Sequence, residues 1–152
     1  YIDNLEVCAE VNGCDLHHIF PKAAMRKKVM EENGIRDKSM ADKFLKTQHN
    51  IDSVLNQTWL LSSTNRDIIS DRMPSDYIRE LIQKNGGSRN AEQKVRDLFK
   101  QHCINDSAFD KLMNDDYFGF IDERKKSVQF ELTTTCKIPN FLESEPVDDL
   151  LF

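Results

Sequence analysis

Two short segments of this chain carry the pattern of β-strands, and most of the rest is patterned for helices. The first, residues 14–20, follows the turn pair Asn12-Gly13 and is closed by Pro21. The second, residues 58–62, is rich in β-forming side chains and is flanked by Asn and Ser. Two strands of this length can build only one small hairpin. The predicted fold class is therefore α+β, mainly α, with a two-stranded hairpin embedded in a helical domain.

The helical pattern supplies the body of the domain. A helix is expected to begin at Lys22 and to stop at Gly34, and a second to cover residues 38–48 with Met40 and Phe44 on one face. Apolar side chains recur at helical spacing in four later segments: residues 76–84, a helix begun by a capping box at Asn90 and Gln93, residues 107–113, and residues 117 to about 132. A single domain of this size can bury a proper core.

The composition is that of a soluble globular protein. Of the 152 residues, 31% are charged and 39% are hydrophobic, and no apolar run approaches the roughly 18 residues that a membrane span needs. The first twenty residues carry acids and histidines instead of a basic start and an apolar stretch, which disfavours a signal peptide. We therefore expect a cytoplasmic location. Because the chain starts at Tyr1 rather than Met, we also expect a fragment of a longer protein.

The four cysteines form neither a metal-binding pattern nor a disulfide framework. Cys8, Cys14, Cys103 and Cys136 are scattered, and no C-x-x-C pair occurs. We expect reduced thiols that are mostly structural, because a free cysteine is commonly buried as a small apolar side chain. This use of cysteine fits a cytoplasmic protein and disfavours a zinc ribbon.

The net charge of −5 is unevenly distributed along the chain. Residues 143–152 hold four acids and no base, which leaves −1 for the remainder. Residues 15–72 hold ten Lys and Arg against eight Asp and Glu. A weakly basic surface can follow phosphates locally, so the charge permits nucleic-acid binding without indicating it.

Adjacent histidines, His17 and His18, stand near the end of the first predicted strand, in the run D-L-H-H-I-F-P that closes at Pro21. A histidine can act as a metal ligand or as a general base, because its unperturbed pKa is near neutrality and its neutral ring binds metals. In a regular strand neighbouring side chains point to opposite faces, so both rings reach one phosphate only if the backbone bends here. Two histidines with structural roles are the alternative.

Two asparagines nine positions apart, Asn56 and Asn65, bracket the second predicted strand. An asparagine at a strand start can hydrogen-bond the backbone of a preceding loop and hold a histidine in place. An asparagine at a helix start can present its carbonyl oxygen to a hard cation. Each asparagine taken alone is more typical of a turn or a helix cap.

The two signals together resemble the ββα-metal core of HNH (His-Asn-His) nucleases, in which a hairpin and one helix form the site. The resemblance consists of His-His-Ile-x-Pro, a helical insertion, and then Asn-x8-Asn-Arg across a strand. It continues with Leu-Leu-Ser-Ser-x-Asn-Arg, Asp-x-x-Pro-Ser-x-Tyr and the late pattern Phe118-x-x-Ile121-x-x-Arg124. These runs are similar to the C-terminal HNH domain of GmrSD-type modification-dependent restriction enzymes and of SspE-like phage-defence effectors. The similarity covers residues 15–132.

The resemblance implies a role for each motif residue. It makes His17 and Asn65 the metal ligands, His18 the general base that activates water, and Asn56 the residue that braces the His-bearing loop. For Arg66, a contact with the scissile or a neighbouring phosphate and a plain surface position are both open. Because the last ligand position holds Asn65 rather than a histidine, the expected metal is Mg2+ or Mn2+, with Zn2+ less favoured.

The resemblance also implies the activity and the setting. It predicts a metal-dependent DNA endonuclease that nicks one strand, the effector part of a restriction or antiviral defence protein. The expected partners are double-stranded DNA, including modified DNA, and a missing N-terminal NTPase and recognition domain, with no membrane. In this division residues 1–14 end a linker, residues 15–132 form the nuclease domain, and residues 133–152 form a C-terminal extension with an acidic tail.

Two other functions remain open from the sequence: a catalytically silent HNH-like domain for DNA binding or assembly, and a helical regulatory module with structural zinc. We interpret Trp59 and Leu61 as core residues, and the aromatic run at residues 117–120 as helix packing rather than base stacking. A basic stretch that would either line the duplex or form a solvated helix face comprises Lys22, Arg26, Lys27 and Lys28. For Asp15, a local contact is favoured over a place in the metal shell.

Overall fold

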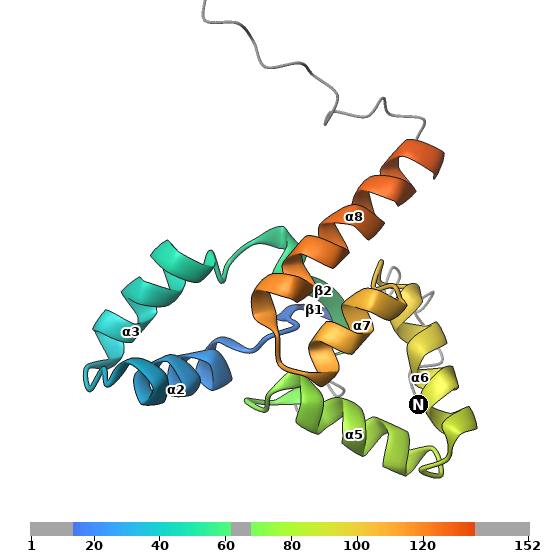
Figure 1. Cartoon of the computed structure of the whole chain (residues 1–152), viewed down its shortest axis with the longest axis horizontal. Coiled ribbons are helices and arrows are strands. Elements are labelled where there is room, and N and C mark those ends of the chain that lie inside the picture. The colour runs from blue at the N-terminus through green and yellow to red at the C-terminus, as the bar shows by residue number, and fades with distance from the viewer. Residues whose placement is uncertain (1–13, 62–67, 136–152) are drawn as a thin grey trace, which may run out of the picture.

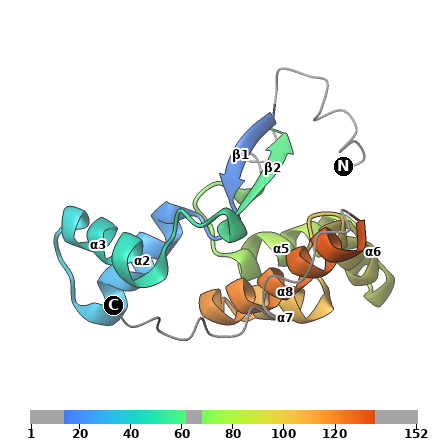
Figure 2. The same ribbon diagram turned by 90° about the horizontal axis from the view of Figure 1, so that it is seen from above.

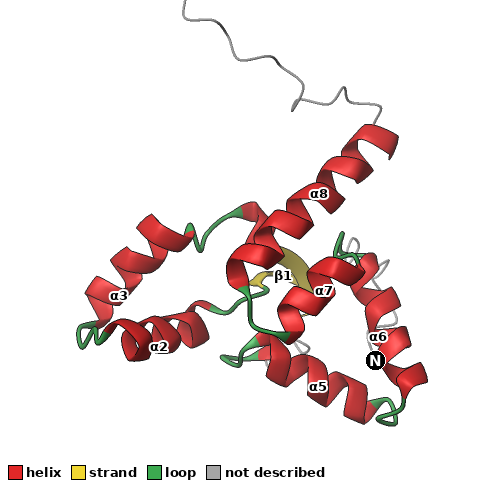
Figure 3. Ribbon diagram, viewed as in Figure 1, coloured by secondary structure: helices red, strands yellow, loops and turns green. Residues whose placement is uncertain are grey.

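The computed structural model describes residues 14–61 and 68–135 and confirms an α+β fold that is mainly α. Within those residues there is a single two-stranded sheet, and helices make up most of the remaining structure (Figure 3). The elements, in chain order, are β1 (Cys14–His18), α2 (Lys22–Asn33), α3 (Lys38–Phe44), the π-helical turn η1 (Leu45–His49), the 3-10 turn η2 (Val54–Asn56), β2 (Gln57–Leu61), α5 (Pro74–Lys84), α6 (Arg89–Lys100), α7 (Asp106–Met113) and α8 (Tyr117–Thr135).

The hairpin is formed by strands that are separated in sequence by a helical insertion. β1 pairs with β2 in antiparallel register, with His17 opposite Thr58 and His18 opposite Gln57. Figure 1 shows α2 and α3 on one side of the hairpin and α5, α6 and α7 on the other. Figure 2 shows the hairpin projecting from the layer that these helices form. The insertion and the C-terminal helices therefore meet at the base of the hairpin, where the histidine pair ends β1.

Local signals set most of the helix ends. Gly34 ends α2 in the left-handed conformation, with φ 64°, as expected from its place after the last helical residue. The Asp37 carboxylate accepts a hydrogen bond from the backbone of Met40 at the start of α3. The cap of α6 is Ser88, whose hydroxyl accepts from the backbone of Ala91. The predicted capping box at Asn90 is therefore wrong, because the helix already includes that residue.

The predicted helix over residues 38–48 is present but changes geometry part-way. α3 ends at Phe44, and the chain continues as the wider turn η1. The buried side chains of this segment are Ala41 and Leu45, one turn apart, whereas Met40 is exposed and Phe44 is half-buried. Met40 and Phe44 lie one turn apart on this helix, as predicted, but the buried stripe of the segment is shifted by one residue, to Ala41 and Leu45.

An aromatic cluster fixes the end of the hairpin in the core. Phe20, two residues after the histidine pair, is fully buried, and its ring lies edge-on to Tyr117 at 5.2 Å and tilted against Phe120 at 5.5 Å. Both partners belong to α8. Packing therefore explains Tyr117 and Phe120, as predicted, whereas Phe118 between them is exposed. Because Phe20 is anchored this way, the backbone that follows His18 enters the core at a defined point.

The outer face of the hairpin is less buried than the sequence suggests. The side chain of Trp59 is 57% exposed, and its cross-strand partner Leu16 is exposed as well, whereas Leu60 is buried. The prediction of Trp59 as a core residue is wrong, because α5 and α6 cover the hairpin face that carries Leu60. The side chain of Leu61 lies outside the described part. Among the described helices, none has the length and apolar character needed to cross a membrane.

Candidate functional site

The turn that follows His18 is held by one buried asparagine. The Asn56 side chain is fully buried, and its Oδ1 accepts from the backbone N–H of Phe20 at 2.9 Å. Its Nδ2 donates to the carbonyl of Phe20 at 3.3 Å and to that of Ile51 at 3.0 Å. The backbone N–H of Ile19 donates to the Asn56 carbonyl at 2.8 Å. Asn56 therefore ties the chain leaving β1 to the chain entering β2.

Two further buried side chains hydrogen-bond the two backbone segments that Asn56 joins. The Tyr77 hydroxyl donates to the carbonyl of Ile19 at 2.9 Å, and burial raises the pKa of Tyr77, so the group remains a donor. Arg124 Nη1 donates to the carbonyls of Leu55 and Gln57 at 2.8 and 2.9 Å. Burial lowers the pKa of Arg124 to about 10, which still leaves the guanidinium charged at neutral pH. Both residues come from motifs singled out in the sequence, but their bracing roles were not foreseen.

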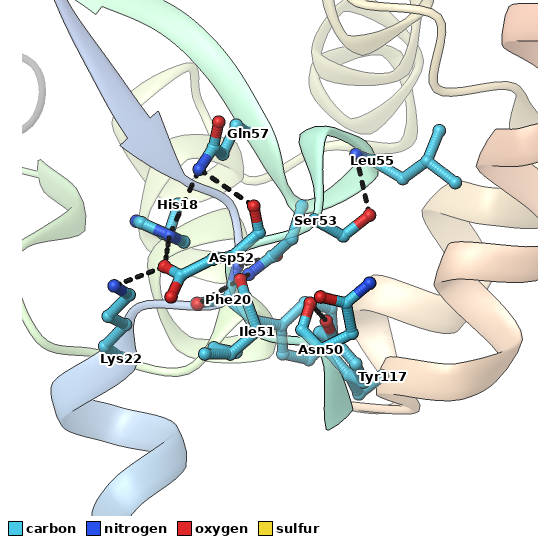
Figure 4. A network of polar contacts seen from close by, with 11 residues as sticks. His18, Phe20, Lys22, Asn50, Ile51, Asp52, Ser53, Leu55, Gln57 and Tyr117 are labelled. Carbon is cyan, nitrogen blue, oxygen red and sulfur yellow. Dashed lines mark hydrogen bonds and ion pairs between the residues drawn. The ribbon is translucent and has the colours of Figure 1, made fainter. Parts of the chain in front are cut away.

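His18 lies in a small polar network at the base of the hairpin (Figure 4). Its Nε2 is 3.2 Å from Asp52 Oδ1, and the same carboxylate forms an ion pair with Lys22, the first residue of α2. The Gln57 side chain donates to the main-chain carbonyl of Asp52 at 3.3 Å. The His18 side chain is 21% exposed, so the ring is partly shielded but open on one side. The residue that contacts the predicted base, Asp52, was missed from the sequence.

The electrostatics of this network favour a neutral ring. Partial burial lowers the pKa of His18, the Lys22 ammonium lowers it further, and the Asp52 carboxylate opposes both effects. The hydrogen bond from Lys22 holds the pKa of Asp52 below its usual range. At neutral pH the network therefore contains a carboxylate, an ammonium and an imidazole that can accept a proton. This is the protonation state that a general base requires.

His17 lies on the opposite face of the hairpin. Its ring lines a cavity of about 40 Å3, together with its cross-strand partner Thr58, with Tyr77 and His102, and with apolar side chains of α5 and α6. The accessible lining of this cavity is almost entirely apolar, so the space offers a water or an ion few polar partners. The bend that would let both rings reach one phosphate does not occur at the histidine pair, because β1 stays paired through His18 and the chain turns only afterwards. The structure therefore does not bring the two rings together.

His102, which follows α6, belongs to none of the sequence motifs described above. Its Nδ1 is 2.7 Å from the hydroxyl of Thr58, and its backbone carbonyl accepts from Arg124 Nη2 at 3.2 Å. Burial lowers the pKa of His102, and the nearby Arg124 charge lowers it further. The ring is therefore packed as a neutral group against β2, beside the position of His17. No local pattern around His102 indicated this contact, which depends on the packing of α6 against the hairpin.

The neutral packing of His102 predicts a loss of stability in mild acid. Its pKa in the fold is below the unfolded value of about 6.5, so the unfolded chain takes up a proton first. The contribution of neutral His102 to the free energy of unfolding is complete above about pH 6.5. It is lost as the pH falls through the pKa that His102 has in the folded protein. Urea denaturation between about pH 7 and about pH 5 is expected to show a falling free energy of unfolding, less steeply in His102→Gln. An unchanged pH dependence in that variant would contradict the prediction.

Three of the predicted site residues lie in the described structure, and two do not. His17, His18 and Asn56 are placed as described, whereas Asn65 and Arg66 lie outside the described residues. Asp15 belongs to β1, but its side chain is also outside the description. Within residues 14–61 and 68–135, no three His, Cys, Asp or Glu side chains gather closely enough to hold a metal ion. Of the two predicted metal ligands, His17 and Asn65, the described residues include only His17.

The basic stretch at the start of α2 is largely engaged within the protein. Lys22 pairs with Asp52, Arg26 pairs with Asp42 at 2.6 Å, and Lys28 Nζ donates to the carbonyl of Asp115 at 3.3 Å. Lys27 is exposed. Intramolecular contacts therefore account for most of this stretch without a nucleic acid.

Cys103 is a free, half-buried thiol.

Comparison with known proteins finds similarity to an uncharacterized archaeal protein. The chain is 40% identical over 104 residues to the uncharacterized protein MJ0686 of Methanocaldococcus jannaschii. The matched region is 66% of this chain but only 15% of the archaeal protein, so the chain corresponds to a small part of that relative. No model of a known protein family matches the chain. No solved structure matches it either.

Proposed function

We propose that this chain is a metal-dependent DNA endonuclease domain of the HNH type, which nicks one strand by phosphodiester hydrolysis. The observation that carries the proposal is the position of His18. It ends a strand on a turn that Asn56 and Tyr77 brace, its ring is neutral and partly open, and a carboxylate contacts it. A positioned neutral imidazole is the group expected to take a proton from an attacking water.

The proposed metal site rests on the chemistry of its donors. His17 would supply an imidazole nitrogen and Asn65 an amide oxygen, although in this structure the His17 ring faces α5 and α6, on the side of the hairpin opposite His18. Two protein ligands of this kind leave positions for water and for a phosphate oxygen, which suits Mg2+ or Mn2+ better than a closed zinc site. When bound, the ion would polarise the phosphate and stabilise the charge on the leaving oxygen. Arg66 would contact a phosphate, and Asn56 would keep the His-bearing turn in place.

The setting of the domain belongs to the same proposal. We infer an effector domain of a larger, cytoplasmic restriction or antiviral defence protein, in which an N-terminal part hydrolyses NTP and recognises modified DNA. A relative of which this chain matches only 15% supports a domain that works within a longer protein. The engagement of Lys22, Arg26 and Lys28 within the protein favours weak DNA affinity for the isolated chain, so that other parts of the protein would deliver the substrate.

Conversion of supercoiled plasmid tests this function directly. The purified chain is expected to produce open-circular DNA with Mg2+ or Mn2+, and none with excess EDTA. Because each domain holds one site, nicked circles are expected to accumulate before linear DNA. Nicking at an undiminished rate in an equally purified His18→Ala preparation would assign the activity to a contaminant or to other residues. DNA binding without nicking under any metal condition would favour the silent binding or assembly domain.

A further inference from the structure

Asp52 lies outside the residues that the HNH resemblance assigns, yet it makes the contact that orients the proposed base. We propose that Asp52 is a positioning residue: its carboxylate accepts a hydrogen bond from Nε2–H of His18 and so leaves Nδ1 as the nitrogen that takes the proton. This inference rests on the proposed function, because it assigns a partner to the base of that reaction. It begins with the 3.2 Å contact between His18 Nε2 and Asp52 Oδ1 (Figure 4).

The chemistry of the two neighbours decides which ring nitrogen carries the hydrogen. A carboxylate can only accept, so its contact with Nε2 requires the hydrogen on Nε2. The Gln57 amide nitrogen, which is a donor, is 3.5 Å from the same atom, at the limit of a hydrogen bond. The two contacts demand opposite tautomers of a neutral ring. The shorter contact to a charged acceptor prevails, since charge-assisted hydrogen bonds are about twice as strong as neutral ones.

Four contacts hold Asp52 and its neighbouring backbone in place. Its carboxylate pairs with Lys22, and its main-chain carbonyl accepts from the Gln57 side chain. On one side of it the carbonyl of Ile51 is bound by Asn56, and on the other the backbone N–H of Ser53 donates to the carbonyl of Asn50 at 2.8 Å. These contacts fix both the backbone and the carboxylate, although the side chain is 44% exposed.

One residue links the two backbone segments that carry the base and the carboxylate. The Nδ2 group of Asn56 donates to the carbonyls of both Phe20 and Ile51. Phe20 follows the His18 segment, and Ile51 directly precedes Asp52. A single buried side chain therefore joins the two turns from which the pair projects.

The arrangement accounts for each atom of the proposed step. An O–H bond of water breaks, and its proton goes to Nδ1 of His18, which becomes an imidazolium paired with Asp52. The water oxygen forms a bond to phosphorus, and the P–O3′ bond breaks with its electron pair remaining on the leaving oxygen. A carboxylate that fixes the tautomer of a histidine and stabilises its cation is a known catalytic arrangement. Asp52 does not contact the reacting atoms and acts only through His18.

The tautomer of His18 can be measured without any nuclease activity. In 15N NMR spectra of the metal-free protein at about pH 8, where the ring is neutral, the native chain is expected to show the Nε2–H form. Asp52→Ala is expected to give a mixture of tautomers or the Nδ1–H form. The matched control is Asp42→Ala, which also removes a carboxylate paired with a cation of α2 and of nearly equal exposure, 43% against 44%. The control should keep the native tautomer.

Nicking rates complete the test. Asp52→Ala is expected to nick plasmid at least about 10-fold more slowly than the native chain, with Asp42→Ala unchanged and both variants melting at similar temperatures. An Nδ1–H ring in the native protein, or a tautomer unaffected by Asp52→Ala, would overturn the proposal. So would a native nicking rate in a variant whose tautomer has changed. A tautomer that depends on Asp52 in a protein that never nicks DNA would support the contact and contradict the nuclease function instead.

Discussion

A His18→Ala variant is expected to nick supercoiled plasmid at least about 100-fold more slowly than the native chain. Positioned general bases contribute factors of about 100 to 10,000, and no other described imidazole shares this partly open position at the end of β1. The remaining rate would reflect metal and phosphate contacts that do not depend on the base. Initial rates of open-circle formation at saturating Mg2+, compared at equal protein concentration, measure the effect.

Two controls separate catalysis from folding in this variant. The contacts that His18 loses are near the surface, so its melting temperature should match that of the native chain within a few degrees. Added imidazole should restore part of the activity of His18→Ala and should leave the native rate unchanged, because a free base can occupy the space left by the ring. A variant that is fully active, or that is inactive because it is unfolded, would remove the support that this experiment offers.

Replacing Asn56 with alanine is expected to have the largest effect on stability, lowering the free energy of unfolding by about 3 kcal/mol. The substitution leaves the N–H and carbonyl of Phe20 and the carbonyl of Ile51 without their side-chain partner in a fully buried place. Each buried polar group left without a partner costs about 1–3 kcal/mol, reduced where the backbone can relax. Urea denaturation monitored by circular dichroism measures the change from the shift of the midpoint.

A second asparagine provides the matched control for Asn56. Asn114 at the end of α7 also donates from its side chain to a backbone carbonyl, that of Asp110, but it is exposed. Asn114→Ala is therefore expected to change stability by less than about 0.5 kcal/mol. Equal losses in the two variants would show that the buried network around Asn56 does not stabilise the turn. Because Asn56 also joins the turns that carry His18 and Asp52, Asn56→Ala should lose nicking activity even at temperatures where it remains folded.

Local patterns in the sequence were sufficient for the elements and for part of the site. The first strand, predicted over residues 14–20 and present over residues 14–18, the stop at Gly34 and the helices from α5 to α8 follow from turn and end signals and helical spacing, which act over a few residues. The role of Asn56 in holding the His-bearing turn was predicted from its position at the start of a strand and from the HNH-like motif. The motif marked Tyr77 and Arg124 as well, but it carried no information about the carbonyls that they bind.

The sequence by itself determined a mainly helical domain with one hairpin, in which His18 ends the first strand and Asn56 precedes the second. These features depend on neighbouring residues. Only the tertiary structure decided which face of the hairpin is covered. Packing of α5 and α6 leaves Trp59 outside and encloses His17, and strand alternation alone does not choose between the two faces. Only the tertiary structure placed Asp52 on His18, 34 positions away, because that contact depends on how the insertion returns to the hairpin.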